Sequence, residues 1–337
     1  MRCASKSVCV LLLCGVLTRA GFCQTTAPAP PVLLPGLTAS QLLDLRMSAD
    51  PKVRAAVAKH FFSQQIGADL ANPDPSVQSS AVAVLKKLLK EDLHDPAGQA
   101  IIPDKSPWCG RLLAQKTTVS RLMKLKEEGL VEQLAAGSIG DGSDLSAVDH
   151  GQAALVKLYL AGGKYELALA AAKAYYNCCA LDKTPAATQL LAQALANGKD
   201  KTLLDRFIQQ QAAAAQPQTA SADGAPASPP VDLGENVLKS IAIDPTPYAA
   251  KIADLAAGPQ DFETLSARGN LLLLSDKGAE AKEVFETALK LAFDQKHVSA
   301  GMANVARALR ARDGNVSAAN AYLMSLRNQP SAAEGTK

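Results

Sequence analysis

Apolar and small side chains recur with a helical period over residues 262–328, and the same order of residue types occurs there twice. In the first copy Gly269 lies three positions before Leu272 on one expected helix, and on the next helix Ala281 lies four positions before Phe285. Residues three or four apart share a helix face, so each helix presents a small residue beside a bulky one. The second copy follows 37 residues later. This pattern predicts two hairpins whose helices pack closely through their small residues.

Short polar segments separate the expected helices. Residues 276–278 (DKG) and 313–315 (DGN) connect the helices of the two copies. Asp, Asn and Gly are typical of tight turns, so the connected helices are expected to be antiparallel. Further helix pairs are expected over residues 147–179 and 184–211, with breaks at the glycines of each segment.

The N-terminal third contains three helix starts with capping signals. Asp50-Pro51 and Asp74-Pro75 place an aspartate cap before a proline at the first helical position, and Thr38 begins a capping-box pattern. Each start leads into an amphipathic stretch. The sequence therefore predicts successive helices from residue 38 onward.

Two later segments are expected to interrupt these helices. Residues 95–110 contain three prolines and the only tryptophan, Trp108, and are predicted to form a loop whose indole closes the helical stack. Residues 111–136 are expected to return to helix. Residues 137–144 (GSIGDGSD) are read as a flexible turn, because they lack the spacing and the following lysine of a phosphate-binding loop.

The hairpins resemble the tetratricopeptide repeat, a helical hairpin with small and aromatic residues at fixed spacings. The matching positions are Gly269, Leu272, Ala281, Phe285 and Ala288 in the first copy, Ala306, Leu309, Ala318, Tyr322 and Pro330 in the second, and Leu155, Tyr159, Gly162, Gly163, Lys164, Tyr165 and Ala168 in the earlier hairpin. The resemblance implies an α-solenoid whose inner surface binds peptides or partner helices.

The chain departs from that family at several positions. Leu265 and Met302 stand where the family has an early tryptophan, Ser325 stands where alanine is usual, and Ala172 replaces an aromatic. The stretch from Asp50 also resembles the start of a HEAT repeat, but the next such start follows too soon for that repeat's two helices.

The first 23 residues have the form of a secretory signal peptide. A positive head precedes an apolar run of about ten residues, half of what a membrane span needs. Cleavage before Gln24 would export the chain to the periplasm or the extracellular space. The alternative of a lipoprotein acylated at Cys23 is disfavoured by Phe22, because a small residue is expected there.

Composition places the mature chain among neutral helical proteins. The whole sequence has 35 Lys and Arg against 32 Asp and Glu, and removal of residues 1–23 leaves 32 of each. A chain without net charge has no overall field to attract nucleic acid or an anionic membrane. The content of 48% hydrophobic and only 4% aromatic residues favours helices that pack through small side chains.

These observations predict an all-α fold, an irregular α-solenoid or helical-hairpin array in two helical units joined by a disordered linker. The linker is rich in Ala, Pro, Ser and Gly and has too little apolar surface to fold. The expected segments are a signal peptide (1–23), a Pro-rich disordered spacer (24–36), an N-terminal helical array (37–211), the linker (212–235), a C-terminal tetratricopeptide-repeat-like domain (236–330) and a disordered tail (331–337).

Three cysteines lie outside the signal peptide: Cys109, Cys178 and Cys179. They are read as structural thiols on small-residue helices, with a disulfide from Cys109 to one of the adjacent pair as the alternative. No C-x-x-C motif is present, and no two histidines lie three or four residues apart. No metal site or cofactor is expected.

Two functional hypotheses follow. The first is an exported, non-enzymatic scaffold in the cell envelope that binds a protein or peptide. Asn270, Arg307 and Arg310 are its candidate contacts, because they lie on helix faces that the hairpin packing leaves free and suit a peptide backbone or carboxylate. The alternative is an exported hydrolase acting on cell-wall glycan or peptide. That chemistry needs two facing carboxylates, whereas acids such as Glu127, Glu128 and Asp205 are scattered.

Overall fold

The computed structural model describes residues 36–57, 62–215 and 236–314, together with residues 320, 322 and 324. The expected signal peptide, spacer residues 24–35, linker residues 216–235 and the tail 331–337 lie outside this part of the chain, as do Ala318, Ser325 and Pro330 of the second copy. Within it, 16 α-helices and one 3-10 helix are present and no strand is formed, which confirms the all-α helical-hairpin array.

The N-terminal half contributes the first seven of these helices. They are α2 (Ala39–Arg46), α3 (Pro51–Val57), α4 (Phe62–Ala71), α5 (Pro75–Lys90), α6 (Lys105–Leu113), α7 (Thr118–Lys124) and α8 (Glu128–Ile139). The remaining elements are α9 (Leu145–Ala161), α10 (Tyr165–Cys178), η1 (Leu181–Lys183), α11 (Thr184–Asn197), α12 (Thr202–Ala215), α13 (Val237–Ser240), α14 (Thr246–Ala257), α15 (Phe262–Leu274), α16 (Gly278–Lys290) and α17 (Gln295–Asp313).

The predicted helix caps are present. The Thr38 hydroxyl accepts a hydrogen bond from the Gln41 amide, and the Gln41 side chain accepts one from the Thr38 amide over 2.8 Å, which completes the capping box. The carboxylates of Asp50 and Asp74 accept hydrogen bonds from the amides two residues later, over 2.9 and 2.8 Å. These contacts satisfy donors that have no partner within the helix.

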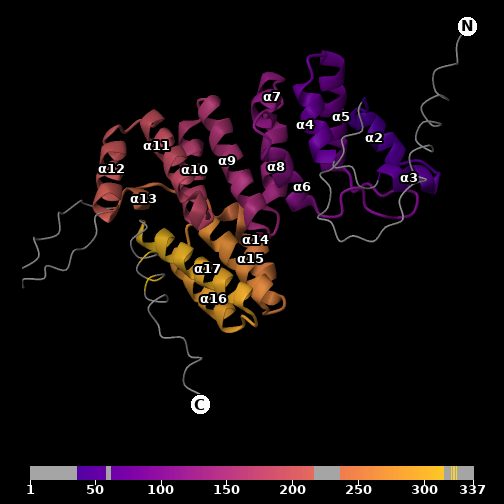
Figure 1. The fold of residues 1–337 in the computed structure, drawn as a ribbon. Helices are drawn as coiled ribbons and strands as arrows, with labels where there is room; N and C mark the ends of the chain where they lie inside the picture. The colour runs from indigo at the N-terminus through magenta and orange to yellow at the C-terminus, as the bar shows by residue number, and fades with distance from the viewer. Residues whose placement is uncertain are drawn as a thin grey trace, which may run out of the picture.

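Figure 1 shows α4–α12 standing side by side in one row, with α14–α17 as a second layer beneath α8–α10. The helices before residue 216 pack against the helices after residue 235. Helices α15–α17 share one hydrophobic core with Ile139, Val148 and Ala174 from α8–α10, and α13 packs into the core of α10–α12. Helices α13 and α15–α17 are therefore part of the same packed body as the array.

The first C-terminal hairpin packs as its spacing predicts. Phe285 and Ala281 on α16 are fully buried. A Cβ atom added at Gly269 on α15 would overlap the ring of Phe285. The aromatic side chain therefore fills the space that the missing side chain leaves, and α15 and α16 approach closely for this reason.

Three expectations about the N-terminal array are corrected. The loop predicted over residues 95–110 ends at Asp104, because α6 begins at Lys105 and carries Trp108 as a buried core residue. Residues 111–136 form parts of α6, α7 and α8 instead of one helix. Residues 212–215, assigned to the linker, continue α12. Apolar contacts around the indole stabilise a helix where the prolines suggested a loop.

Candidate functional site

The carboxyl end of α10 is buried beneath α17, and two arginines bind its free carbonyl groups. The last carbonyls of an α-helix have no partner within the helix. Arg307 donates from Nε to the carbonyl oxygen of Cys178 over 2.9 Å. Arg310 donates from one Nη to the carbonyl oxygen of Cys179 over 2.7 Å. The positive charges lie at the negative end of the helix dipole, so α17 caps α10 from a position 129 to 131 residues away.

The three residues predicted to contact a partner are inside the molecule. Arg307, Arg310 and Asn270 are 1%, 0% and 4% exposed. The Asn270 side chain accepts a hydrogen bond from Arg307 over 2.9 Å and donates one to the carbonyl oxygen of Gly142 over 2.7 Å. The prediction that these three side chains lie on a free surface and contact a partner is therefore wrong. The faces of α15 and α17 that hairpin packing leaves free are covered by α10 and by the turn before α9.

A buried lysine makes a second polar contact between the two layers. Lys173 on α10 donates to the Asp276 carboxylate over 2.6 Å and to the carbonyl oxygen of Ile241 over 2.7 Å. Asn177 donates to the other oxygen of Asp276 over 3.1 Å. Sequence reasoning missed this contact. Its only signal was that Lys173 and Asn177 are polar residues four apart on an otherwise apolar helix, which places them on one face.

Asp149 on α9 is the buried carboxyl group nearest to this junction. One of its oxygens accepts a hydrogen bond from the Ala180 amide over 3.3 Å, and the other has no partner among the described residues. Burial raises the pKa of Asp149 to about 6, although the Ala180 amide and the charges of Arg307 and Arg310 act in the opposite direction.

Replacing Asp149 by asparagine is expected to change the pH dependence of stability. Because the pKa of the folded carboxyl is about 6 and the usual value is near 4, the folded chain binds the extra proton between these values. The stability contributed by this group is therefore lost as the pH rises through 6. Between pH 4 and 7 the variant should gain up to about 3 kcal/mol relative to the parent chain.

Urea unfolding of both chains at a series of pH values measures this difference. Parallel stability profiles for the variant and the parent chain would show that the carboxyl is ionised equally in the folded and unfolded states. An Asp254→Asn variant serves as the control, because this carboxylate is exposed on α14.

The cysteines are free thiols in three different hydrophobic clusters, and all three are buried. No disulfide joins Cys109 to Cys178 or Cys179, which agrees with their interpretation as structural thiols. Burial raises the pKa of Cys109 and of Cys178 to about 12, so both are protonated at neutral pH.

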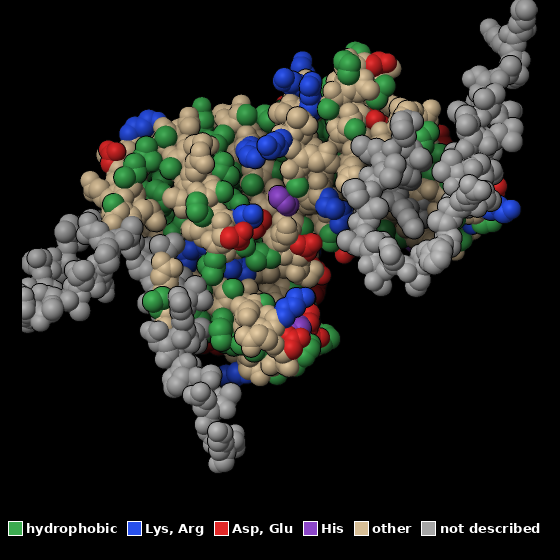
Figure 2. Space-filling model, in the orientation of Figure 1, with side chains coloured by type: hydrophobic (Ala, Val, Ile, Leu, Met, Phe, Trp, Pro, Cys, Tyr) green, Lys and Arg blue, Asp and Glu red, His purple; other side chains and the backbone are tan. Residues whose placement is uncertain are grey.

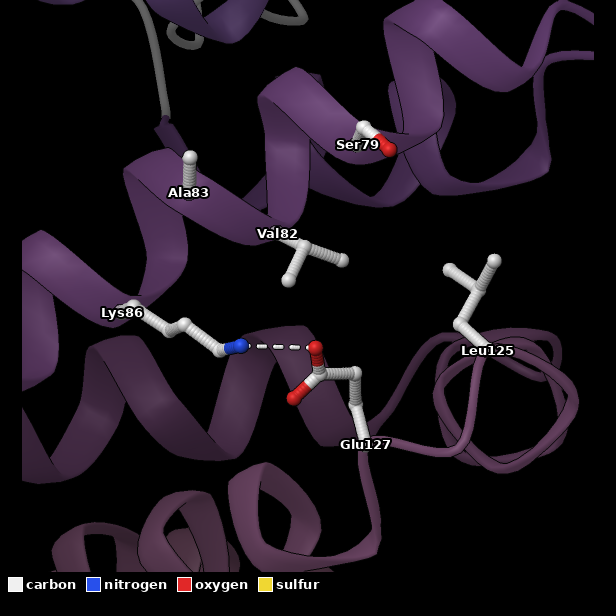
Figure 3. A pocket seen from close by; sticks show the side chains of 6 residues that line it. All are labelled: Ser79, Val82, Ala83, Lys86, Leu125 and Glu127. Atoms are coloured by element: carbon white, nitrogen blue, oxygen red, sulfur yellow. Dashed lines mark hydrogen bonds and ion pairs between the residues drawn. The ribbon is translucent and has the colours of Figure 1, made fainter.

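An open groove of about 300 Å³ lies between α5 and the turn from α7 to α8 (Figure 3). Val82 and Leu125 approach each other from its two sides, and the Lys86 ammonium spans it to reach the Glu127 carboxylate over 2.7 Å. The complete lining is Ser79, Val82, Ala83, Lys86, Leu125 and Glu127. The groove thus combines apolar walls with one exposed ion pair.

The sequence held a partial signal for this groove. Ser79, Val82, Ala83 and Lys86 are spaced by three, four and seven residues, which places them on one face of α5. The opposite side of the groove, Leu125 to Glu127, is a turn. The sequence predicts helix for these residues, so it gives no signal for this side.

The acids considered for hydrolase chemistry are not brought together. Glu127 pairs with Lys86, whereas Asp205 lies on α12 near the other end of the row (Figure 1). The two buried carboxyl groups of the described residues, Asp69 and Asp149, accept backbone hydrogen bonds on different helices. In residues 36–57, 62–215 and 236–314, no group of three His, Cys, Asp or Glu side chains has metal-binding geometry.

None of the described helices has the length and apolar character needed to cross a bilayer. Comparison of the chain with protein-family models, with curated proteins and with solved structures finds no match. The candidate site is therefore defined by its own geometry.

Proposed function

We propose that this chain is an exported, non-enzymatic helical-repeat scaffold that binds a protein or peptide through its helical array. The observation that carries the proposal is the groove between α5 and the α7–α8 turn, which is open at the surface of the packed array and is lined by apolar side chains and the Lys86–Glu127 ion pair. Polypeptide segments offer both apolar and charged groups, so they suit such a surface.

The hairpin packing supports the scaffold part of the proposal. The fit of Phe285 against Gly269 is the contact that the resemblance to tetratricopeptide repeats implies, and hairpins of this kind build extended binding surfaces. The signal-like first 23 residues support export to the periplasm or the extracellular space. The proposed binding surface differs from the one inferred from the sequence, because Arg307 and Arg310 are buried and donate hydrogen bonds to the end of α10.

Site-specific photo-crosslinking in the native host tests this proposal. A photoreactive amino acid at Ser79, an exposed position in the groove, is expected to form discrete adducts with polypeptide. The same amino acid at Ser240 on α13 is the matched control, because Ser240 is exposed and lies at the other end of the row (Figure 1). Mass spectrometry of the adduct should also find an N-terminus at Gln24.

Equal labelling at Ser79 and Ser240, or adducts that contain no second polypeptide, would contradict binding at the groove. An adduct that retains residues 1–23 would contradict cleavage before Gln24. These two readouts test binding and processing separately.

A further inference from the structure

Two residues other than glycine have left-handed backbone conformations in the described chain, Lys126 with φ 59° and Asp276 with φ 61°. Both follow a helix and occupy equivalent turns. The amide of Lys126 donates to the carbonyl of Met123, and the amide after it donates to the carbonyl of Leu122. Glycine is the usual residue at this position of a helix end, because its backbone adopts positive φ without steric cost.

At Asp276 the side chain explains why glycine is not used. Its carboxylate binds Lys173 and Asn177 and so holds the two layers together. At Lys126 the side chain is exposed and makes no hydrogen bond or ion pair with any described residue. A lysine in this conformation therefore has no structural role within the described chain that a glycine could not fill.

Lys126 lies between Leu125 and Glu127, which both line the groove. The segment from residue 105 to residue 126 contains six basic residues and no Asp or Glu: Lys105, Arg111, Lys116, Arg121, Lys124 and Lys126. The last four are within ten residues of one another, and two of them, Arg121 and Lys124, lie on α7. Figure 2 shows Lys and Arg side chains gathered at the upper edge of the molecule, in the middle of the row, where Figure 1 places α7.

The acidic groups nearest to these lysines in the chain are Glu127 and Glu128. Glu127 is paired with Lys86 across the groove, and Glu128 is exposed in the first turn of α8. Lys124 and Lys126 are exposed and are the immediate chain neighbours of the lining residues Leu125 and Glu127, so they place positive charge beside the groove.

We propose that this groove binds an acidic segment of a partner protein. An apolar side chain of the segment would lie between Val82 and Leu125, and neighbouring carboxylates would lie against Lys124 and Lys126. The inference rests on the proposed function and names the class of partner. A phosphate backbone or a lipid headgroup would match the lysines but would leave the apolar walls unfilled, whereas a peptide supplies both groups.

Fluorescence anisotropy with the full chain tests the proposal. The probe is a fluorescein-labelled 12-residue peptide that repeats Asp-Leu-Glu-Phe, and its control has Asn and Gln in place of the acids. In about 50 mM salt the acidic peptide is expected to bind at least about tenfold more tightly than the control. The ratio should fall towards one in about 500 mM salt, because exposed charges are then screened.

A glycine substitution separates binding from folding. Lys126→Gly removes the ammonium and also the unfavourable left-handed lysine, so Tm should not fall. Affinity for the acidic peptide is expected to fall about fivefold. Lys290→Ala, which removes an exposed charge from α16, is the matched control and should leave affinity unchanged.

Three results would overturn the proposal: equal affinity for the acidic and amide peptides, equal effects of Lys126→Gly and Lys290→Ala, or displacement of the peptide by polyphosphate or anionic phosphatidylglycerol vesicles at equal charge concentration. Such results combined with polypeptide adducts at Ser79 would leave the scaffold proposal in place and reject the acidic partner. Absence of the adducts would reject the scaffold proposal itself.

Discussion

Replacing Phe285 by alanine is expected to lower the free energy of unfolding by about 3 to 5 kcal/mol. The ring is fully buried and fills the space at Gly269, and the guanidinium carbon of Arg307 lies 5.8 Å from the ring centre. Alanine would leave a cavity bounded by the backbone of α15, which cannot collapse without moving the helix. Urea unfolding followed by circular dichroism measures the loss.

A second substitution tests whether the loss of stability in Phe285→Ala arises from the fit of the ring against Gly269. Gly269→Leu alone should destabilise the chain, because its side chain overlaps the Phe285 ring. In the double variant Gly269→Leu, Phe285→Ala the leucine occupies part of the space that the ring vacates. The stability that the double variant loses should therefore be smaller than the sum of the two single losses by about 1 kcal/mol or more. Strictly additive effects would show that the two positions do not share this space.

An exposed position supplies the control for this series. Leu291→Ala removes a hydrophobic side chain that is 45% exposed at the end of α16. Its effect should stay within about 0.5 kcal/mol. A near-neutral Phe285→Ala variant, similar to Leu291→Ala, would contradict the packing of the hairpin.

Replacing Arg310 by alanine should cost about 3 kcal/mol. Its guanidinium donates to the Thr184 hydroxyl over 2.5 Å and to the carbonyl oxygens of Cys179 and Asn177 over 2.7 and 3.2 Å. Without the arginine these buried acceptors lose their donor, and a buried group without a partner costs about 1 to 3 kcal/mol. The end of α10 also loses a positive charge near its negative pole.

Two variants make this prediction specific. Arg310→Lys keeps the charge but cannot bond three separate acceptors through a planar fork, so it should recover only part of the stability. Arg312→Ala removes a neighbouring arginine that is exposed and paired with Asp313, and its effect should stay within about 0.5 kcal/mol. Equal losses for Arg310→Ala and Arg312→Ala would reject the arginine cap of α10.

The effects of substitutions at Phe285 and at the arginine cap of α10 are expected to be coupled. Arg307 lies over the ring of Phe285 and also donates to the end of α10, so it links the interior of the hairpin to the contact between the two layers. Loss of the ring should therefore loosen the packing of α17 on α10. Hydrogen exchange of the α10 amides would record this as faster exchange in the Phe285→Ala variant.

Helix starts and hairpin turns could be read from the sequence because they depend on neighbouring residues. The caps at Thr38, Asp50 and Asp74 bind amides within three residues, and the turn at Asp276 is local. The loop expected around Trp108 was wrong because contacts of the indole with distant helices decide that segment, and propensity alone does not include them.

The sequence by itself determined the all-α class and the close packing of the first C-terminal hairpin through its small residues, because helical period and small-residue spacing act over a few turns. Only the tertiary structure decided where Arg307 and Arg310 point and that a groove lies between α5 and the α7–α8 turn. A helical pattern shows which residues share a face. It does not show which element covers that face, because burial of α17 depends on α10, more than 100 residues earlier in the chain.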